Sequence, residues 1–151
     1  KQCLEKSGAS VYSSNYSIGV NIFFEINKKL GALMAPHHEY EVILEEIHHT
    51  AKKDAPSGTA ITLAEDILKQ IQRKKQWVND LSDNPEDLEI ISQRIDPTPG
   101  THSVKYSSVI DNIEIIHTAH NRTGFATGSV IAAEFLSGKS GFYTMKDVLG
   151  L

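Results

Sequence analysis

The strongest constraint on the fold lies between residues 41 and 71, where the spacing of the apolar side chains changes. Val42 and Leu44 alternate with Ile43 and Ile47, which predicts a strand with apolar residues on both faces. After a turn at residues 56–59, apolar residues recur at helical spacing: Ala60, Ile61, Ala64, Ile67, Leu68 and Ile71. A strand of this kind is buried or covered by a partner, so the sheet needs cover on both sides.

The same spacings predict the other elements. We expect strands at 9–12, 88–95, 102–110 and 113–120, and helices at 18–34, 60–75, 123–136 and 144–149. Asp111-Asn112 is short enough to join the last two strands as a tight hairpin. This order predicts an α+β fold: an open mixed β-sheet with helices on one face and the other face used for oligomerisation. Candidates for the second face are Ile43, Ile47, Ile91, Ile95 and Ile115.

Composition narrows the class of protein. The 151 residues are 40% hydrophobic and 23% charged, as in soluble globular domains. A net charge of −4 without a basic stripe argues against a nucleic-acid partner, and no apolar run is long enough to cross a membrane. A single Cys3 and the absence of a signal-peptide core predict a cytoplasmic location. Because residue 1 is not Met, we expect the chain to begin inside a longer protein.

The turn Ser57-Gly58-Thr59 enters the helix that starts near Ala60. The first N–H groups of a helix lack intrahelical partners and carry the positive end of its dipole. With two hydroxyls and a glycine beside them, these N–H groups predict a binding site for a carboxylate or phosphate. The alternative is that Ser57 or Thr59 only caps the helix.

Two proton-bearing side chains precede this turn. Lys52 can hold an anion or deliver a proton, and His48, four residues earlier, titrates near neutral pH. His48 and His49 would face opposite ways in a regular strand, so one can serve chemistry while the other binds substrate or braces the loop. An adjacent pair of histidines is also a common structural feature, and that interpretation stays open.

Metal and serine chemistry are the competing hypotheses. The seven histidines include His37-His38, His48-His49 and the pair His117/His120, but there is no HExxH motif and no cysteine cluster. We therefore predict no metal, and a zinc hydrolase using His48 and His49 is the weakest hypothesis. A serine nucleophile lacks its G-x-S-x-G elbow.

Four segments together resemble one enzyme family. Residues 48–60, HHTAKKDAPSGTA, closely resemble the signature of dihydrodipicolinate reductases, also called 4-hydroxy-tetrahydrodipicolinate reductases. Residues 14–21, 121–128 and 137–149 are similar to the family's domain-crossing segment, later cofactor-side loop and C-terminal end. The segments occur in the family's order and span nearly the whole chain.

This resemblance implies roles for individual residues. His48 would be the acid/base group and Lys52 the proton donor. His49, Ser57, Gly58 and Thr59 would hold a substrate with two carboxylates. The residues bordering a nicotinamide cofactor, NADH or NADPH, would be Ser13, Ser14, Asn15, Tyr16 and Arg122. The family's reaction belongs to the diaminopimelate route to lysine, and its members are expected to form homotetramers.

The chain departs from the family at its beginning. The N-terminal dinucleotide-binding domain with its Gly-rich turn is missing, because no G-x-G-x-x-G precedes Ser7. We therefore expect residues 1–16 to be the tail of that domain, 17–138 the substrate-binding and oligomerisation domain, and 139–151 a segment returning toward the missing part. Alone, this chain should be inactive. The alternative function is a non-catalytic anion-binding or assembly module on the same scaffold.

Overall fold

A computed structural model describes residues 8–151, so Cys3 and part of the predicted tail lie outside the described residues. The chain divides into two compact units. One consists of residues 23–120, and the other combines the described residues 8–22 with 121–151. The three-part division expected from the sequence stays a prediction.

The larger unit contains a five-stranded sheet in the order β3-β4-β2-β5-β6. The strands are β2 (Glu41–His48), β3 (Gln76–Val78), β4 (Asp87–Arg94), β5 (Gly100–Ser107) and β6 (Asn112–Ala119). β2 is central: it pairs in parallel with β4 and antiparallel with β5. The sheet is therefore mixed, which confirms the predicted α+β class.

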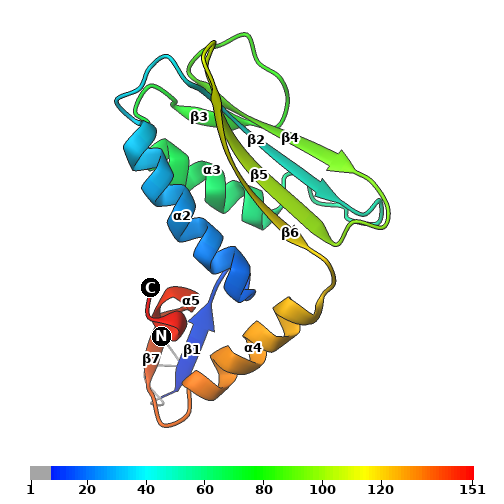
Figure 1. Ribbon diagram of the computed structural model, residues 1–151. Coiled ribbons are helices and arrows are strands. Elements are labelled where there is room, and N and C mark those ends of the chain that lie inside the picture. Colours follow the sequence, from blue (N-terminus) through cyan, green and yellow to red (C-terminus); the bar gives the residue numbers. More distant parts are fainter. Residues whose placement is uncertain (1–7) are drawn as a thin grey trace. The chain divides into compact units, whose positions relative to one another are not determined.

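Two helices, α2 (Ile18–Met34) and α3 (Gly58–Gln70), lie against the same face of this sheet (Figure 1). The pleat of β2 turns Val42, Leu44, Glu46 and His48 toward that face, and all four are buried. The helices contact each other where the Asn27 amide donates a 3.0 Å hydrogen bond to the Leu63 carbonyl oxygen. The core thus lies between the sheet and these helices, and it includes two polar side chains at the end of β2.

The opposite face of the sheet is covered by no helix within residues 23–120. It carries Ile43, Ile47 and Ile91, as the alternation predicts. Ile115 was assigned to this face wrongly, because the register pairs it with Val104, a residue of the helix-covered face. Ile116 takes its place, pairing with Ser103, and is 58% exposed.

The smaller unit joins the two ends of the described chain. β1 (Ala9–Tyr12) pairs in parallel with β7 (Gly141–Thr144), and α4 (Thr123–Phe135) and α5 (Met145–Leu149) complete the unit. α4 approaches the backbone just before α2 at Gly128, where an added Cβ would lie 1.8 Å from the Tyr16 carbonyl oxygen. The close approach of two backbones therefore requires a glycine at this position.

Several predicted boundaries were wrong. The second helix ends at Gln70 rather than near residue 75, and the chain continues into β3, which was not predicted; β7 was not predicted either. The hairpin between β5 and β6 turns through Ser108–Asp111 instead of two residues. Ser108 Oγ accepts hydrogen bonds from the backbone N–H of Ile110 and Asp111, both at 3.1 Å, and this local bonding favours the longer loop.

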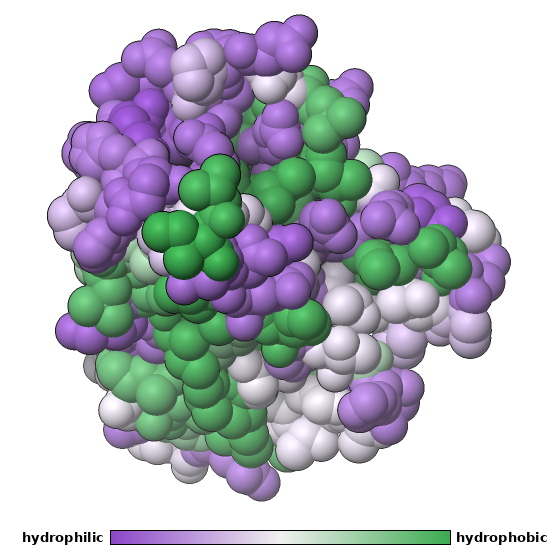
Figure 2. Space-filling view, turned by 45° about the horizontal axis from the view of Figure 1, so that its top comes forward, coloured by the Kyte–Doolittle hydropathy of each residue, from purple (hydrophilic) through white to green (hydrophobic). Residues whose placement is uncertain are grey.

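Apolar side chains on α2 divide between two faces. Val20, Phe23, Phe24 and Met34 are buried, whereas Ile18, Ile22, Ile26 and Leu33, which share the helical spacing, are exposed. Apolar residues gather in patches on the side of the molecule shown in Figure 2. Within residues 8–151, every helix is too short or too polar to cross a lipid bilayer.

Candidate functional site

The centre of the candidate site is the carboxylate of Glu46. This side chain lies between the sheet and the helices and is fully buried. Three protein groups donate hydrogen bonds to it. The Ser57 N–H lies 3.1 and 3.2 Å from its two oxygens, Ser92 Oγ lies 2.8 Å from Oε1, and Arg94 Nη2 lies 3.2 Å from Oε1. A buried charge survives only when it is paired and hydrogen-bonded, so this network is what keeps Glu46 inside the fold.

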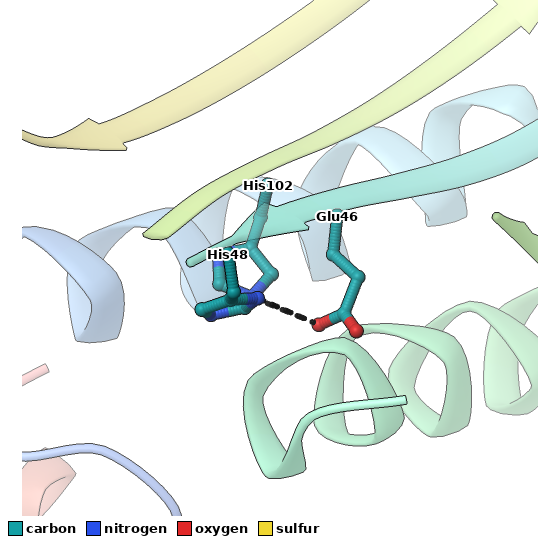
Figure 3. Close-up of side chains that lie close together, drawn as sticks. All are labelled: Glu46, His48 and His102. Carbon is teal, nitrogen blue, oxygen red and sulfur yellow. Dashed lines mark ion pairs between the residues drawn. The ribbon is translucent and has the colours of Figure 1, made fainter. Parts of the chain in front are cut away.

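Two imidazoles adjoin the other carboxylate oxygen (Figure 3). His48 Nδ1 lies 3.4 Å and His102 Nε2 lies 3.7 Å from Glu46 Oε2, and the rings meet edge to face with centroids 5.0 Å apart. His102 Nε2 is also 3.1 Å from Ser57 Oγ. Space for the His48 ring comes from Gly100 on β5, where a Cβ would lie 3.2 Å from Nε2. Glu46 therefore adjoins both rings, Ser57 bonds to His102, and Gly100 lies against His48.

The environment keeps Glu46 ionised. Burial raises the pKa of its carboxyl group, but the interactions with His102, Ser57, Ser92 and His48 together lower it further than burial raises it. The net effect is a pKa well below the usual value of a glutamic acid. The site therefore holds a permanent negative charge at neutral pH.

His48 is held neutral instead. Burial, the largest effect, lowers the pKa of its imidazole to about 4, against an ordinary value of 6.5. The negative charge of Glu46 opposes this shift, while His102, Lys52 and Arg94 add to it. At neutral pH the ring can accept a proton or use its single N–H as a donor, but it is not itself a store of positive charge.

The start of α3 differs in part from the expectation. Ser57 is the N-cap, because its side chain accepts a hydrogen bond from the Ala60 N–H, so the capping interpretation holds for this residue. The Ser57 N–H, expected to face a bound anion, is taken by Glu46. Gly58 is exposed, and its N–H meets no acceptor in the part of the chain that is described. The Ser57 amide is therefore not available to an external anion, whereas the Gly58 amide is exposed.

The two remaining residues of the signature lie on the loop after β2. Lys52 Nζ contacts both carboxylate oxygens of Asp54 at 2.8 Å, and its charge contributes to the lowered pKa of His48. His49 is half-buried and lies near Asp96, whose pKa is lowered mainly by hydrogen bonds from the Thr50 side chain and backbone. The structure thus places Lys52 within electrostatic range of His48, while His49 lies next to a different carboxylate.

The candidate cofactor residues all belong to the smaller unit. Ser13 Oγ donates a 2.6 Å hydrogen bond to the Asn15 carbonyl oxygen, and Asn15 Oδ1 accepts one of 2.9 Å from the Ser17 N–H. Tyr16 donates its hydroxyl to the Val11 carbonyl oxygen at 2.9 Å. These side chains build the turn before α2, so any contact with a cofactor would come in addition to a structural role.

Two more candidates complete this set. Ser14 is exposed in the same turn, and Arg122 precedes α4, where it makes no side-chain hydrogen bond to cap the helix. The exposed guanidinium of Arg122 is suited to an anionic ligand.

Sequence reasoning missed four residues of the buried network: Glu46, Ser92, Arg94 and His102. Glu46 had a detectable signal, because a glutamate stood at a position of β2 that alternation turns toward the core. Ser92 and Arg94 carry the same signal on β4, since they share the face of Ile90. The residues around His102 in the sequence gave no sign of its role, because its partners Ser57 and Glu46 lie 45 or more positions away.

The fold and the site define a class: an α+β domain that places titratable side chains beside the first amide of a helix. Such a site suits the binding and protonation of an anionic small molecule. A family profile described as "Dihydrodipicolinate reductase, C-terminus" matches residues 19–149. The chain therefore belongs to the dihydrodipicolinate reductase family, as the resemblance predicted.

Individual relatives agree with this assignment. The chain is 52% identical over 147 residues to the 4-hydroxy-tetrahydrodipicolinate reductase of Christiangramia forsetii, covering 97% of this chain and 61% of the relative. The enzyme of the same name from Methanosarcina mazei is 38% identical over 146 residues, with 94% and 54% covered. The chain thus spans about half to three fifths of the length of these relatives.

A solved structure has the same fold. It is described as "Dipicolinate bound Dihydrodipicolinate reductase from Paenisporosarcina sp. TG-14" and has a TM-score of 0.63 at 20% sequence identity. The match covers 95% of this chain and 57% of that one.

Proposed function

We propose that this chain is the substrate-binding half of an NAD(P)H-dependent reductase. The complete enzyme would reduce 4-hydroxy-tetrahydrodipicolinate to tetrahydrodipicolinate in the diaminopimelate route to lysine. Family membership and the names of the relatives support this activity. The related structure described as dipicolinate-bound supports a ring with two carboxylates as the ligand.

One observation carries the proposal: within the signature segment, the Lys52 ammonium acts electrostatically on the buried, neutral imidazole of His48, and the exposed Gly58 follows at the start of α3. Lys52 is paired here with Asp54, whose side chain is 60% exposed. A substrate carboxylate would replace Asp54 as the partner of Lys52, at little cost because the displaced carboxylate moves into water. A second contact comes from the Gly58 N–H at the positive end of α3.

The proposed chemistry follows from the charges. Hydride addition from the nicotinamide to an unsaturated ring builds electron density that must be matched by a proton. Because His48 is neutral at neutral pH, the ammonium of Lys52 is the better proton donor. His48 would then accept and return protons, or orient the ring by a hydrogen bond. His49 and the Ser57–Thr59 turn would complete the substrate-binding site.

Cofactor binding would involve both this chain and the expected N-terminal domain. We propose that Ser13, Ser14, Asn15, Tyr16 and Arg122 border the nicotinamide end of NADH or NADPH, and that a dinucleotide-binding domain of the complete enzyme holds the rest. The cytoplasm remains the predicted compartment.

The open face of the sheet is the proposed site of self-association. Ile43, Ile47, Ile91 and Ile116 lie on it, and β6 is an edge strand of the sheet. A second copy would bury these side chains, and family resemblance favours a tetramer. Sedimentation or light scattering of the wild type and of Ile116→Asp tests this: the substitution should shift the mass toward the monomer.

Titration of the chain with dipicolinate in buffer containing EDTA tests the substrate site. We expect measurable binding, and Lys52→Ala should weaken it by about tenfold or more because a charge-assisted hydrogen bond is lost. The matched control is Lys53→Ala, a neighbouring exposed lysine that should leave the dissociation constant unchanged. Equal effects of the two substitutions would remove Lys52 from the site.

A second measurement tests the activity itself. When the chain is fused to a dinucleotide-binding domain of its family, NAD(P)H oxidation should depend on 4-hydroxy-tetrahydrodipicolinate, and Lys52→Ala should reduce turnover by orders of magnitude. Dicarboxylate binding without any reduction would favour the non-catalytic module.

A further inference from the structure

Three atoms of the kind that bind transition metals converge at the end of β2 (Figure 3). They are a carboxylate oxygen of Glu46 and one ring nitrogen each of His48 and His102, and all lie within 4.8 Å of one another. Glu46 Oε2 is 3.4 Å from His48 Nδ1 and 3.7 Å from His102 Nε2. Ligands that each lie about 2.0–2.2 Å from a tetrahedral Zn²⁺ are separated by roughly 3.3–3.6 Å. The two separations from Glu46 Oε2 are therefore close to those of a formed site, and the two ring nitrogens lie within 4.8 Å of each other.

We propose that Glu46, His48 and His102 bind a divalent transition-metal ion such as Zn²⁺. Two imidazoles and one carboxylate are a known ligand set for this ion, and three protein ligands leave one position for water. Metal binding does not depend on the proposed reductase activity, because it uses only the side chains of this buried cluster.

Burial supports the proposal. His48 is 7% exposed and His102 4% exposed, so both rings are largely shielded from competing water. His48 Nδ1 is buried and has no hydrogen-bond partner in the described part of the chain. Unpaired buried polar atoms are rare in native proteins and call for an explanation, and a metal ion between this nitrogen and Glu46 provides one.

The surroundings also resemble the outer partners of a metal site. Ser92 and Arg94 hold Glu46 Oε1, which leaves Oε2 turned toward the imidazoles. Ligating carboxylates are commonly fixed by such hydrogen bonds. Ser57 Oγ bonds His102 Nε2 at 3.1 Å, so a bound metal would replace this hydrogen bond. The positive charge of Arg94 opposes a cation nearby, so we expect a dissociation constant in the micromolar range rather than that of a permanent structural zinc.

Occupation of the site would have one consequence for the proposed enzyme. The metal would take the lone pair of His48, the residue assigned to proton transfer. Zn²⁺ would therefore act as an inhibitor and not as a cofactor of the reduction.

Calorimetric titration of the EDTA-treated, dialysed chain with ZnCl₂ tests the proposal. We expect one ion bound per chain, and His102→Asn and Glu46→Gln should each weaken binding by about tenfold or more. The matched control is the double substitution His37→Ala, His38→Ala, which removes an adjacent pair of exposed histidines and should leave the dissociation constant unchanged. With Co²⁺ as the probe, the wild type should show the intense visible absorption of a tetrahedral site.

Two outcomes would overturn the proposal: no binding by the wild type, or binding that survives His102→Asn and disappears in the His37/His38 control. If a cluster variant fails to fold, ¹⁵N spectra of the wild-type histidines decide, because Zn²⁺ must shift Nδ1 of His48 and Nε2 of His102. Dipicolinate is left out, since it chelates metals itself. Dicarboxylate binding in EDTA with no zinc binding would refute the metal site alone.

Discussion

The N-termini of α2 and α3 satisfy their polar groups in different ways. Ahead of α2, Ser13, Asn15, Ser17 and Asn21 are linked by hydrogen bonds that join residues two to six positions apart. At the start of α3, the Ser57 N–H bonds to Glu46, 11 residues away, and Ser57 Oγ lies against His102, 45 residues away. The bonds described at the first helix start join near neighbours in the sequence, whereas those of Ser57 to Glu46 and His102 require β2 and β5 to be in place.

The two helix starts also differ in the titration behaviour of their side chains. A local turn can be stable without any deeply buried charge, so it needs no unusual titration behaviour. Glu46 and His48 have shifted pKa values because distant elements remove them from water. Shifted pKa values and a long-range network at one helix start are typical of functional sites.

The largest effect is expected from removing the centre of the long-range network. Glu46→Ala leaves Arg94 and two imidazoles without their carboxylate, and breaking a buried pair in this way should lower the free energy of unfolding by about 3–5 kcal/mol. Urea denaturation measures it. The control is Glu45→Ala, the exposed neighbour on the open face, which should change stability by less than about 0.5 kcal/mol. Similar losses of unfolding free energy in both variants would show that the buried carboxylate of Glu46 does not stabilise the fold.

The next effect is a dependence of stability on pH. Because the pKa of His48 is about 4 when folded and 6.5 when unfolded, the unfolded chain binds more protons between these values. Stability should therefore be full above pH 6.5 and fall as the pH decreases to 4, by on the order of 3 kcal/mol for this group.

His48→Gln should flatten the pH dependence in this window. His117, whose pKa is also lowered by burial, remains in both proteins, so the difference between them isolates His48. Glu46 loses its contribution only below its unfolded value of 4.5. Unfolding curves in EDTA across this range provide the measurement, and parallel curves would contradict a neutral, buried His48.

A third test probes the α2 start from outside its own turn. Gly128→Ala would place a methyl group 1.8 Å from the Tyr16 carbonyl oxygen, so the backbones must separate. We expect a loss of about 1–3 kcal/mol, as for other overpacked sites. Gly124→Ala is the matched control on the same helix, because its Cβ would meet Ser17 Oγ at an ordinary 3.5 Å. A harmless Gly128→Ala would mean that α4 does not hold this turn.

The smallest effect is expected from the local turn itself. Asn15→Ala removes the acceptor of the Ser17 N–H, and such losses at helix starts cost about 1 kcal/mol. Thermal unfolding of Asn15→Ala beside Glu46→Ala gives the comparison directly. A loss as large as that of Glu46→Ala would abolish the distinction between a local and a long-range helix start.

Much of this molecule follows from its sequence. The alternation in β2 and the spacing after Gly58 are local patterns of side-chain polarity, so they predicted a strand, a helix and the faces of Ile43 and Leu44. The signature loop identified His48, Lys52 and the Ser57 turn as candidates, because those residue types occur together in a short segment. Whether they bind substrate or cofactor stays a prediction.

Tertiary structure decided the rest, because it depends on which distant residues share a space. The register of β5 with β6 put Ile115 under the helices and Ile116 on the open face, and no local pattern distinguishes these two isoleucines. Only the packing of β2 with its neighbours brings Glu46 and His102 together and gives the Ser57 amide an internal partner. Sequence therefore determined which elements and chemical groups are present, while the long-range pairing of strands determined which groups are buried, charged and in contact.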